Sequence, residues 1–215
     1  DLEAAARRAV ELQPTHVPSL GLLGMCLSLQ QKPDEAATFF ERARQADPLA
    51  SFPYMLTALG LLTVRRPREA HRHAEQALIF EKDDASALFC SGLANVALGR
   101  HEEGSAAAEH GVGVTHRGPD VVGLLGWALA TAGRKDDART LREELRGRPA
   151  AAPTIVSAGW LLGALGETDA AFEVFARAED EHQLWLYYTG LPGFDPLRSY
   201  PRFTEMLSRL ELPAE

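Results

Sequence analysis

The sequence predicts an all-α protein: an α-α solenoid of about five stacked helical hairpins, with an N-terminal half-repeat and a C-terminal capping helix. Three observations support this fold class. The strong helix formers Ala, Leu, Arg and Glu are abundant, and aromatic residues make up only 7% of the chain. Glycine and proline are spread along the chain as single turn signals and form no linker. Similar side chains also return about every 34 positions.

The 34-residue period holds at several kinds of position. One series is large and apolar: Leu20, Tyr54, Leu88, Val122 and, after 33 residues, Ile155. A second series is small: Gly24, Ala58, Gly92, Gly126 and Gly159. A third series is also small and lies further along each unit: Ala36, Ala70, Gly104, Ala138 and Ala171. Because a fixed period of this length is typical of repeat proteins, we expect a row of similar two-helix units.

Within one unit, the spacing predicts two helices joined by a turn. Leu20, Gly24 and Leu27 stand at i, i+4 and i+7, so they share one face of a first helix. Gly99 marks the turn of a later unit, and Pro33 stands at an earlier turn, where it suits the first residue of the second helix. A single hairpin cannot bury its own apolar stripe. Neighbouring units are therefore expected to stack into a superhelix.

The expected units follow the period. The array covers residues 1–190 and divides into a half-repeat, 1–16, and five repeats, 17–50, 51–84, 85–118, 119–151 and 152–184. The half-repeat supplies only a second helix, so its partner helix is expected upstream. A homodimer could form through this exposed end or through the groove. Gly104, Gly111 and Gly113 occupy one second helix, and glycine disfavours helix interiors. We therefore expect residues 104–118 to be the loosest part of the array.

The C-terminal region, residues 191–215, breaks the period. Pro192, Gly193 and Pro196 indicate a turn, and Pro201 suits the start of a helix. The following apolar residues fall on one helical face: Phe203, Met206, Leu207 and Leu210. We expect this helix to cap the open face of the last repeat.

One unit carries a family resemblance. Its characteristic residues are Leu20, Leu23, Gly24, Leu27, Ala36, Phe40, Ala43 and Asp47-Pro48. This pattern resembles the tetratricopeptide repeat, and the resemblance extends over about residues 1–180, with departures at Lys82 and Asn95. It implies a right-handed superhelix that binds proteins. The tail from Phe194 to Phe203 also resembles one found in bacterial signalling proteins, although Tyr200 replaces a common Asp there.

The resemblance implies where a ligand would bind, because the first helices of such arrays line a concave face. The residues expected there are Met25, Phe52, Met55, Leu59, Leu62, Phe89, Leu93, Val96, Trp127, Val156 and Trp160. An exposed apolar strip predicts a groove for an apolar peptide or helix. The alternative is that these side chains pack together, or that the chain itself covers them. The polar clamp with which some members bind terminal carboxylates is absent, since Gly21, Met25, Met55 and Leu59 occupy its places.

No pattern in the sequence indicates catalysis, a cofactor or a metal. No nucleophile or phosphate-binding motif is present. His71 and His73 stand two positions apart on a predicted helix and point in different directions, whereas a zinc site favours a spacing of four. We therefore expect a non-catalytic interaction scaffold. The second hypothesis is a regulatory or sensory module of a larger bacterial signalling enzyme or transcription regulator.

The net charge limits the classes of binding partner, and the cysteine content bears on the cellular compartment of the protein. The net charge of −8 disfavours nucleic acid and anionic membranes as main partners. The basic cluster from Arg65 to His73 is either a solvated helix face or a docking patch. No apolar run is long enough to span a bilayer. Cys26 and Cys90 are expected to be reduced and buried, as is usual in a cytoplasmic protein.

Overall fold

The computed structural model describes residues 2–147 and 155–213, and every regular element in these ranges is helical. The α-helices are α1 (Leu2–Leu12), α2 (Val17–Leu29), α3 (Pro33–Ala46), α4 (Ser51–Thr63), α5 (Pro67–Phe80), α6 (Ala85–Ala97), α7 (His101–Val114), α8 (Pro119–Thr131), α9 (Lys135–Arg146), α10 (Val156–Leu165), α11 (Thr168–Asp180) and α12 (Pro201–Arg209). Two short 3-10 helices, η1 (Leu184–Tyr187) and η2 (Pro192–Leu197), lie between α11 and α12. The predicted all-α fold class is confirmed.

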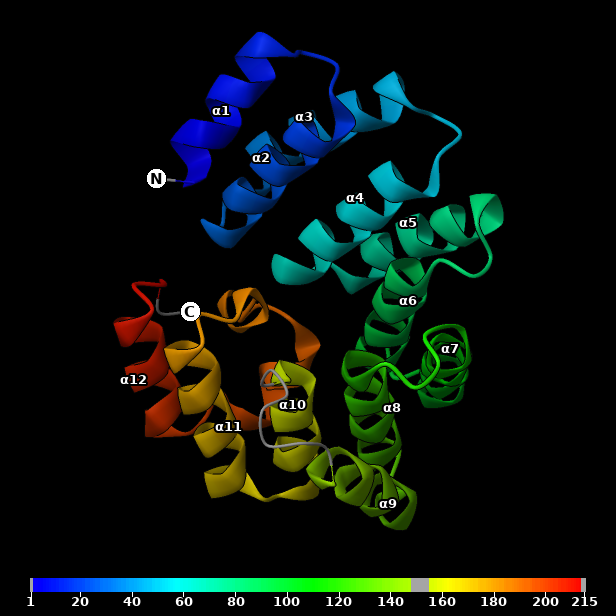
Figure 1. Ribbon diagram of the computed structural model, residues 1–215, viewed down its shortest axis with the longest axis vertical. Helices are drawn as coiled ribbons and strands as arrows, with labels where there is room; N and C mark the ends of the chain where they lie inside the picture. The colour runs from blue at the N-terminus through cyan, green and yellow to red at the C-terminus, as the bar shows by residue number, and fades with distance from the viewer. Residues whose placement is uncertain (1, 148–154, 214–215) are drawn as a thin grey trace.

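The helices pair into hairpins that stack in chain order. The paired helices are α2 with α3, α4 with α5, α6 with α7, α8 with α9, and α10 with α11. The first helices α2, α4, α6, α8 and α10 also contact one another in series. The stack curves, and the segment that contains η1 and η2 lies inside the curve (Figure 1). The expected unit boundary between residues 151 and 152 lies outside the described residues.

The turn inside each hairpin explains part of the period. One residue of the turn has a positive φ, and these residues are Gln31, Arg65, Gly99, Gly133 and Gly166. Positive φ is unfavourable for residues with a Cβ atom, so glycine is the usual choice. Proline begins the second helix at Pro33 and Pro67, where its missing N–H costs no hydrogen bond. Two early turns thus keep a side chain where the later ones have glycine.

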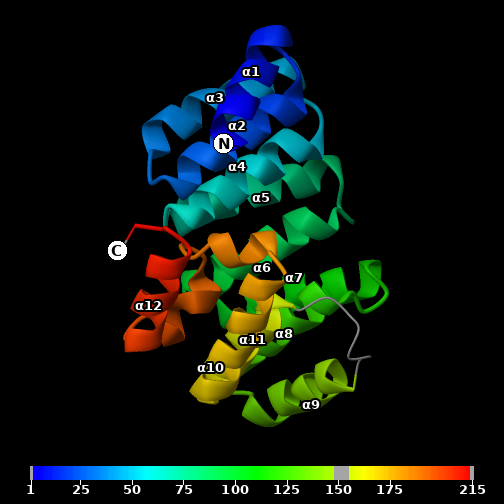
Figure 2. The same cartoon turned by 60° about the vertical axis from the view of Figure 1, so that its left-hand side comes forward.

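The last helix packs along α11. Its apolar stripe is buried, with exposed fractions of 3% for Phe203, 1% for Met206, 4% for Leu207 and 8% for Leu210. Arg209 forms an ion pair with Glu179 of α11, with 3.0 Å between Nη2 and Oε2. Helix α12 therefore covers the array at its C-terminal end, as Figure 2 also shows.

One further sequence expectation concerns the looseness of residues 104–118 in helix α7. Helix α7 runs without interruption from His101 to Val114, although it contains Gly104, Gly111 and Gly113. Its expected looseness concerns motion and stays a prediction.

No helix in the described ranges has the length and hydropathy required to cross a lipid bilayer.

Candidate functional site

The apolar ladder predicted for the concave face is buried. Of the nine residues expected to bind a peptide, eight are at most 9% exposed: Met25, Met55, Leu59, Phe89, Leu93, Trp127, Val156 and Trp160. The ninth, Phe52, is 42% exposed, and the flanking Leu62 and Val96 are buried. These eight side chains are therefore not exposed to solvent, contrary to the expectation of a solvent-lined strip, and residues from another part of the chain pack against Phe89 and Trp160. Whether these residues bind a peptide stays a prediction.

Residues 184–198, which we call the C-terminal segment, pack against part of this ladder. It consists of η1, a connecting stretch and η2, and it lies between α11 and the first helices in both views (Figures 1 and 2). Leu186, Leu191, Phe194 and Leu197 have no exposed surface. A stretch without repeats thus lies along the inner face of the array.

Aromatic side chains join the C-terminal segment to α6 and α10. The ring of Trp185 packs against Phe89 of α6, with 5.4 Å between centroids. The ring of Phe194 stands edge-on to Trp160 of α10, with 5.5 Å between centroids. Phe89 and Trp160 also contact each other at 6.2 Å. Such pairs are favourable beyond the area they bury, so this cluster anchors the segment to two separate repeats.

The backbone of the segment approaches the array closely at Gly190. A Cβ atom built on Gly190 would lie 1.7 Å from the carbonyl oxygen of Thr63, at the end of α4. No side chain fits in this space without moving backbone. Gly193 is similarly placed, since a Cβ there would lie 2.2 Å from the Trp160 ring. Because these two residues are glycines, the backbone of the segment can lie directly against α4 and the Trp160 ring.

An ion pair joins the segment to the turn between α4 and α5. Arg65 Nη1 lies 2.7 Å from Asp195 Oδ1, and Arg198 Nε also donates to this oxygen at 2.8 Å. Arg198 donates further to the carbonyl oxygen of Thr189. The side chains of Arg65 and Asp195 are 48% and 44% exposed. At that exposure an ion pair contributes at most about 1 kcal/mol, so it orients the segment more than it stabilises it.

Two indole donors in the buried ladder have no acceptor. Trp127 and Trp160 are 2% and 1% exposed, and neither Nε1 atom makes a hydrogen bond within the part of the chain that is described. Buried indole N–H groups usually find an acceptor, and an unmade bond costs about 1–3 kcal/mol. The C-terminal segment packs against the Trp160 ring without accepting from its Nε1 atom, and the Trp127 donor likewise has no acceptor among the described residues.

Burial keeps the thiols of Cys26 and Cys90 and the phenol of Tyr188 in their neutral forms. Burial raises the pKa of the Cys90 thiol, and burial followed by the nearby charge of Glu3 raises the pKa of Cys26. Burial also raises the pKa of Tyr188 in the segment. Thiols with raised pKa values stay protonated and are poor nucleophiles. Both cysteines are buried and free, as predicted.

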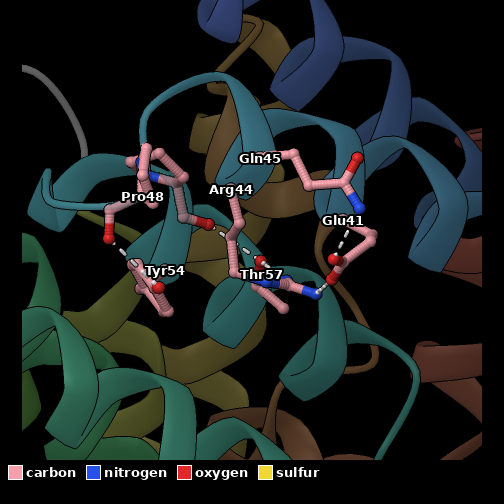
Figure 3. Close-up of polar contacts among 7 residues, drawn as sticks. Glu41, Arg44, Gln45, Pro48, Tyr54 and Thr57 are labelled. Carbon is pink, nitrogen blue, oxygen red and sulfur yellow. Dashed lines mark hydrogen bonds and ion pairs between the residues drawn. The ribbon is translucent and has the colours of Figure 1, made fainter.

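A second concavity lies between the α2–α3 and α4–α5 hairpins. Its cavity volume is about 170 Å³, and its lining includes Ser28, Phe40, Arg44, Thr57 and His73. Arg44 Nη1 donates to Thr57 Oγ1 at 2.7 Å, and its other nitrogen pairs with Glu41 (Figure 3). Burial, followed by the charges of Arg44 and Arg72, lowers the pKa of His73 to about 4. The pocket therefore presents a neutral imidazole beside a guanidinium that is already paired.

The residues one period after the lining of this pocket differ from it in polarity. Ala37 lines the pocket, and the residue 34 positions later is His71. Leu61 is followed in the same way by Asn95, which donates to Ser91 at 3.2 Å. Ser91 in turn donates to Glu75 at 2.9 Å. Polar side chains, His71 and Asn95, thus occupy the places that correspond to Ala37 and Leu61.

The basic cluster between α4 and α5 is largely paired. Arg66 forms two hydrogen bonds with Glu69, of 2.6 and 2.7 Å, and Arg65 pairs with Asp195. Of the two interpretations of this cluster, pairing and solvation agree with these contacts better than an open basic patch does.

Among the described residues, no three His, Cys, Asp or Glu side chains are grouped so that they could hold a metal ion.

Known proteins share part of the sequence pattern and the fold of most of the chain. Residues 1–51 match the family model described as tetratricopeptide repeat. No curated protein matches the sequence. The solved structure of PilF from Pseudomonas aeruginosa is 16% identical with a TM-score of 0.57, and the match covers 86% of this chain and 84% of PilF.

Two further solved structures are similar. YrrB, described as a TPR protein with an unusual peptide-binding site, is 19% identical with a TM-score of 0.54, over 85% of this chain and 95% of YrrB. MamA is 17% identical with a TM-score of 0.54, over 67% of this chain and 84% of MamA. At these identities the likenesses establish the fold alone, a stack of helical hairpins.

Proposed function

We propose that this tetratricopeptide-repeat protein is a non-catalytic interaction scaffold whose concave groove binds an extended apolar segment of a partner protein. The proposed binding residues are Met25, Phe52, Met55, Leu59, Phe89, Leu93, Trp127, Val156 and Trp160. The observation that supports the proposal is that two of these residues, Phe89 and Trp160, already pack against a segment without repeats, the chain's own residues 184–198. A partner segment of similar chemistry would meet the same side chains.

The chemistry of the groove favours apolar anchors. Burying one large apolar side chain contributes about 1.5–3 kcal/mol, and Trp and other aromatic residues commonly dominate binding energy. The net charge of −8 favours a protein partner over nucleic acid. YrrB, which has the same fold, is described as having a peptide-binding site, and this agrees with the proposal without establishing it.

The protonated state of the two cysteines agrees with the non-catalytic part of the proposal. The raised pKa values of Cys26 and Cys90 keep both thiols protonated at neutral pH. The unpaired polar atoms of Trp127 and Trp160 are indole donors, which do not titrate in the physiological range. The groove therefore offers surfaces and donors for binding, and little for proton transfer.

A regulatory module is the second candidate function. The observation that favours it is that the groove is occupied from within the same chain, through the contact of Asp195 with Arg65. A module whose binding surface is covered by its own segment can respond to a signal that uncovers it. The covering segment includes Phe194 to Arg198, which lies within the tail that resembles those of signalling proteins.

Selection from a library of displayed peptides tests the proposed function. Random peptides of about 15 residues, matching the length of the C-terminal segment, are selected on the chain of residues 1–215. We expect enriched peptides with aromatic and leucine residues. We also expect the change Phe52→Glu, at an exposed groove residue, to weaken them about tenfold.

The matched control is Ile79→Glu, at a 74% exposed residue of α5 that is not part of the groove. This variant should bind the selected peptides as the unchanged chain does, and circular dichroism should show equal helicity in both variants. A lack of enriched peptides would reject the proposed function. Equal loss of binding in both variants would reject the groove as its site.

A further inference from the structure

We infer that the C-terminal segment is an exchangeable internal occupant of the groove, and that the external partner is an extended peptide segment with aromatic and leucine anchors. This partner would follow the same path and offer carbonyl oxygens to the indole N–H groups of Trp127 and Trp160. The inference rests on the proposed function of the groove, and adds the chemistry of the partner and the way its access is controlled.

The first step is that the segment resembles a bound peptide more than a repeat. It lies outside the 34-residue period and contains only the short 3-10 helices η1 and η2. Its anchors are single apolar side chains: Leu186, Leu191, Phe194 and Leu197. It contacts α6 through Trp185 and the α4–α5 turn through Asp195, both more than 90 positions away in sequence. Its path across the first helices is the path expected of a peptide ligand.

The second step is that the internal occupant fits the groove incompletely. The Nε1 atoms of Trp127 and Trp160 are buried and find no acceptor among the described residues. Gly193 and Phe194 both pack against the Trp160 ring, but neither accepts a hydrogen bond from its indole nitrogen. An extended peptide carries a carbonyl oxygen at every residue. A partner that places two of them on these donors would gain hydrogen bonds that the C-terminal segment does not make.

The third step concerns the backbone of Arg65. Its φ is +60°, at the turn position where the three later hairpins have Gly99, Gly133 and Gly166. An arginine is less favourable than glycine in this conformation, but only the arginine reaches Asp195. The residue with the unfavourable backbone conformation, Arg65, is therefore the residue that forms the ion pair. Because the pair is about half exposed, salt screens it and solvent reaches it.

The consequence is a threshold for binding. A partner can enter only while the C-terminal segment is released. The apparent affinity therefore equals the affinity of the open groove multiplied by the fraction of chains in which the groove is open. A signal that weakens the contact between Arg65 and Asp195, or a partner that satisfies the indole donors, would shift the population towards the open state.

The test uses the full chain and, as probe, a fluorescein-labelled synthetic peptide with the sequence of residues 184–198. The change Gly190→Ala in the chain puts a Cβ against the Thr63 carbonyl oxygen and should keep the internal segment from seating. The added peptide retains its glycine and can seat. We expect the variant to bind the peptide at least about tenfold more tightly than the unchanged chain, measured by fluorescence anisotropy. A peptide that itself carries Gly190→Ala should not bind.

A second variant, Arg65→Gly, keeps the test decisive if Gly190→Ala does not fold. Glycine suits the positive φ of this turn, so the array should retain its helicity while the ion pair is lost. We expect tighter peptide binding than in the unchanged chain, a weaker dependence of that binding on salt, and faster amide hydrogen exchange confined to residues 184–198. Peptide binding no tighter than that of the unchanged chain in this folded variant would overturn the inference.

The two proposals can fail separately. If selected peptides bind in a way that depends on Phe52 but amide exchange in residues 184–198 does not change, the proposed function stands and the exchange is rejected. If no peptide is selected at all, while the added segment binds Gly190→Ala, the groove takes its own segment alone and the proposed partner is rejected. Loss of helicity in Gly190→Ala together with unchanged binding in Arg65→Gly would make the segment a fixed part of the core.

Discussion

The ring of Phe194 lies edge-on against the indole of Trp160, with 5.5 Å between their centroids. This contact joins the stretch without repeats to the fifth of the first helices, α10. It also helps to bury Trp160, one residue of the ladder that was expected to face solvent. Residues 184–198 pack against Phe89 and Trp160, so the protein's own chain occupies this part of the expected groove.

Removing the Phe194 ring should destabilise the protein strongly. The residue has no exposed surface and contacts Trp160, Phe175 and Phe203. Phe194→Ala should lower the free energy of unfolding by about 3–5 kcal/mol, because it leaves a cavity among packed rings. Urea denaturation followed by circular dichroism measures the loss. Leu184→Ala, at a 57% exposed residue, is the control and should change stability by less than about 0.5 kcal/mol.

Two glycines of α7 should respond to substitution in opposite directions. A Cβ on Gly113 would meet no atom within 4 Å, so Gly113→Ala should raise the free energy of unfolding by about 0.5–1 kcal/mol, as alanine favours helix. A Cβ on Gly104 would lie 2.6 Å from Val96 Cγ2, so Gly104→Ala should destabilise. Thermal unfolding of both variants distinguishes the cases. Destabilisation by Gly113→Ala would contradict the open surroundings of that residue.

Stability should fall in mildly acidic solution through His73. Burial, then the charges of Arg44 and Arg72, lowers its pKa from 6.5 to about 4. Between these pH values the unfolded chain binds more protons than the folded chain, so the free energy of unfolding decreases as pH falls through this window. Urea denaturation at pH 7 and pH 4.5 should show a smaller decrease for His73→Gln than for the unchanged chain. An equal decrease would show that His73 does not contribute.

The two thiols should be unreactive in the folded protein. Cys26 and Cys90 are buried, and burial raises both pKa values. An aromatic disulfide reagent at neutral pH should label neither cysteine before the chain unfolds, and both rapidly in urea. Mass spectrometry of the labelled chain identifies the site. Rapid labelling of native Cys90 would indicate that the surrounding helices open readily.

The sequence predicted those features that depend on repetition. Residues such as Leu20 and Gly24 return with the period because each hairpin must bury the same face against its neighbours, so the helices and their pairing could be anticipated. The resemblance to the tetratricopeptide repeat is confirmed by the matched family and the shared fold. Pro33 and Pro67 stand at helix starts for the same local reason.

The sequence left a groove covered by the chain itself open as an alternative, but it could not identify the segment that lies there. Arg65 and Asp195 are 130 positions apart, and residues 184–198 carry no period that would place them on the array. Two signals were nevertheless present in the sequence. Arg65 stands at a turn position where later units have glycine, and Gly190 and Gly193 closely follow apolar residues, as expected of a backbone that packs against another. Neither signal identifies its contact without the structure.

The central claim is that residues 184–198 lie in the groove in solution, and nuclear Overhauser effects between the ring protons of Phe194 and Trp160 test it most directly. With the centroids 5.5 Å apart, isotopically labelled chain should give clear cross-peaks between these rings. Their absence, together with narrow, random-coil signals from residues 184–198, would contradict the account and leave the apolar ladder open to solvent.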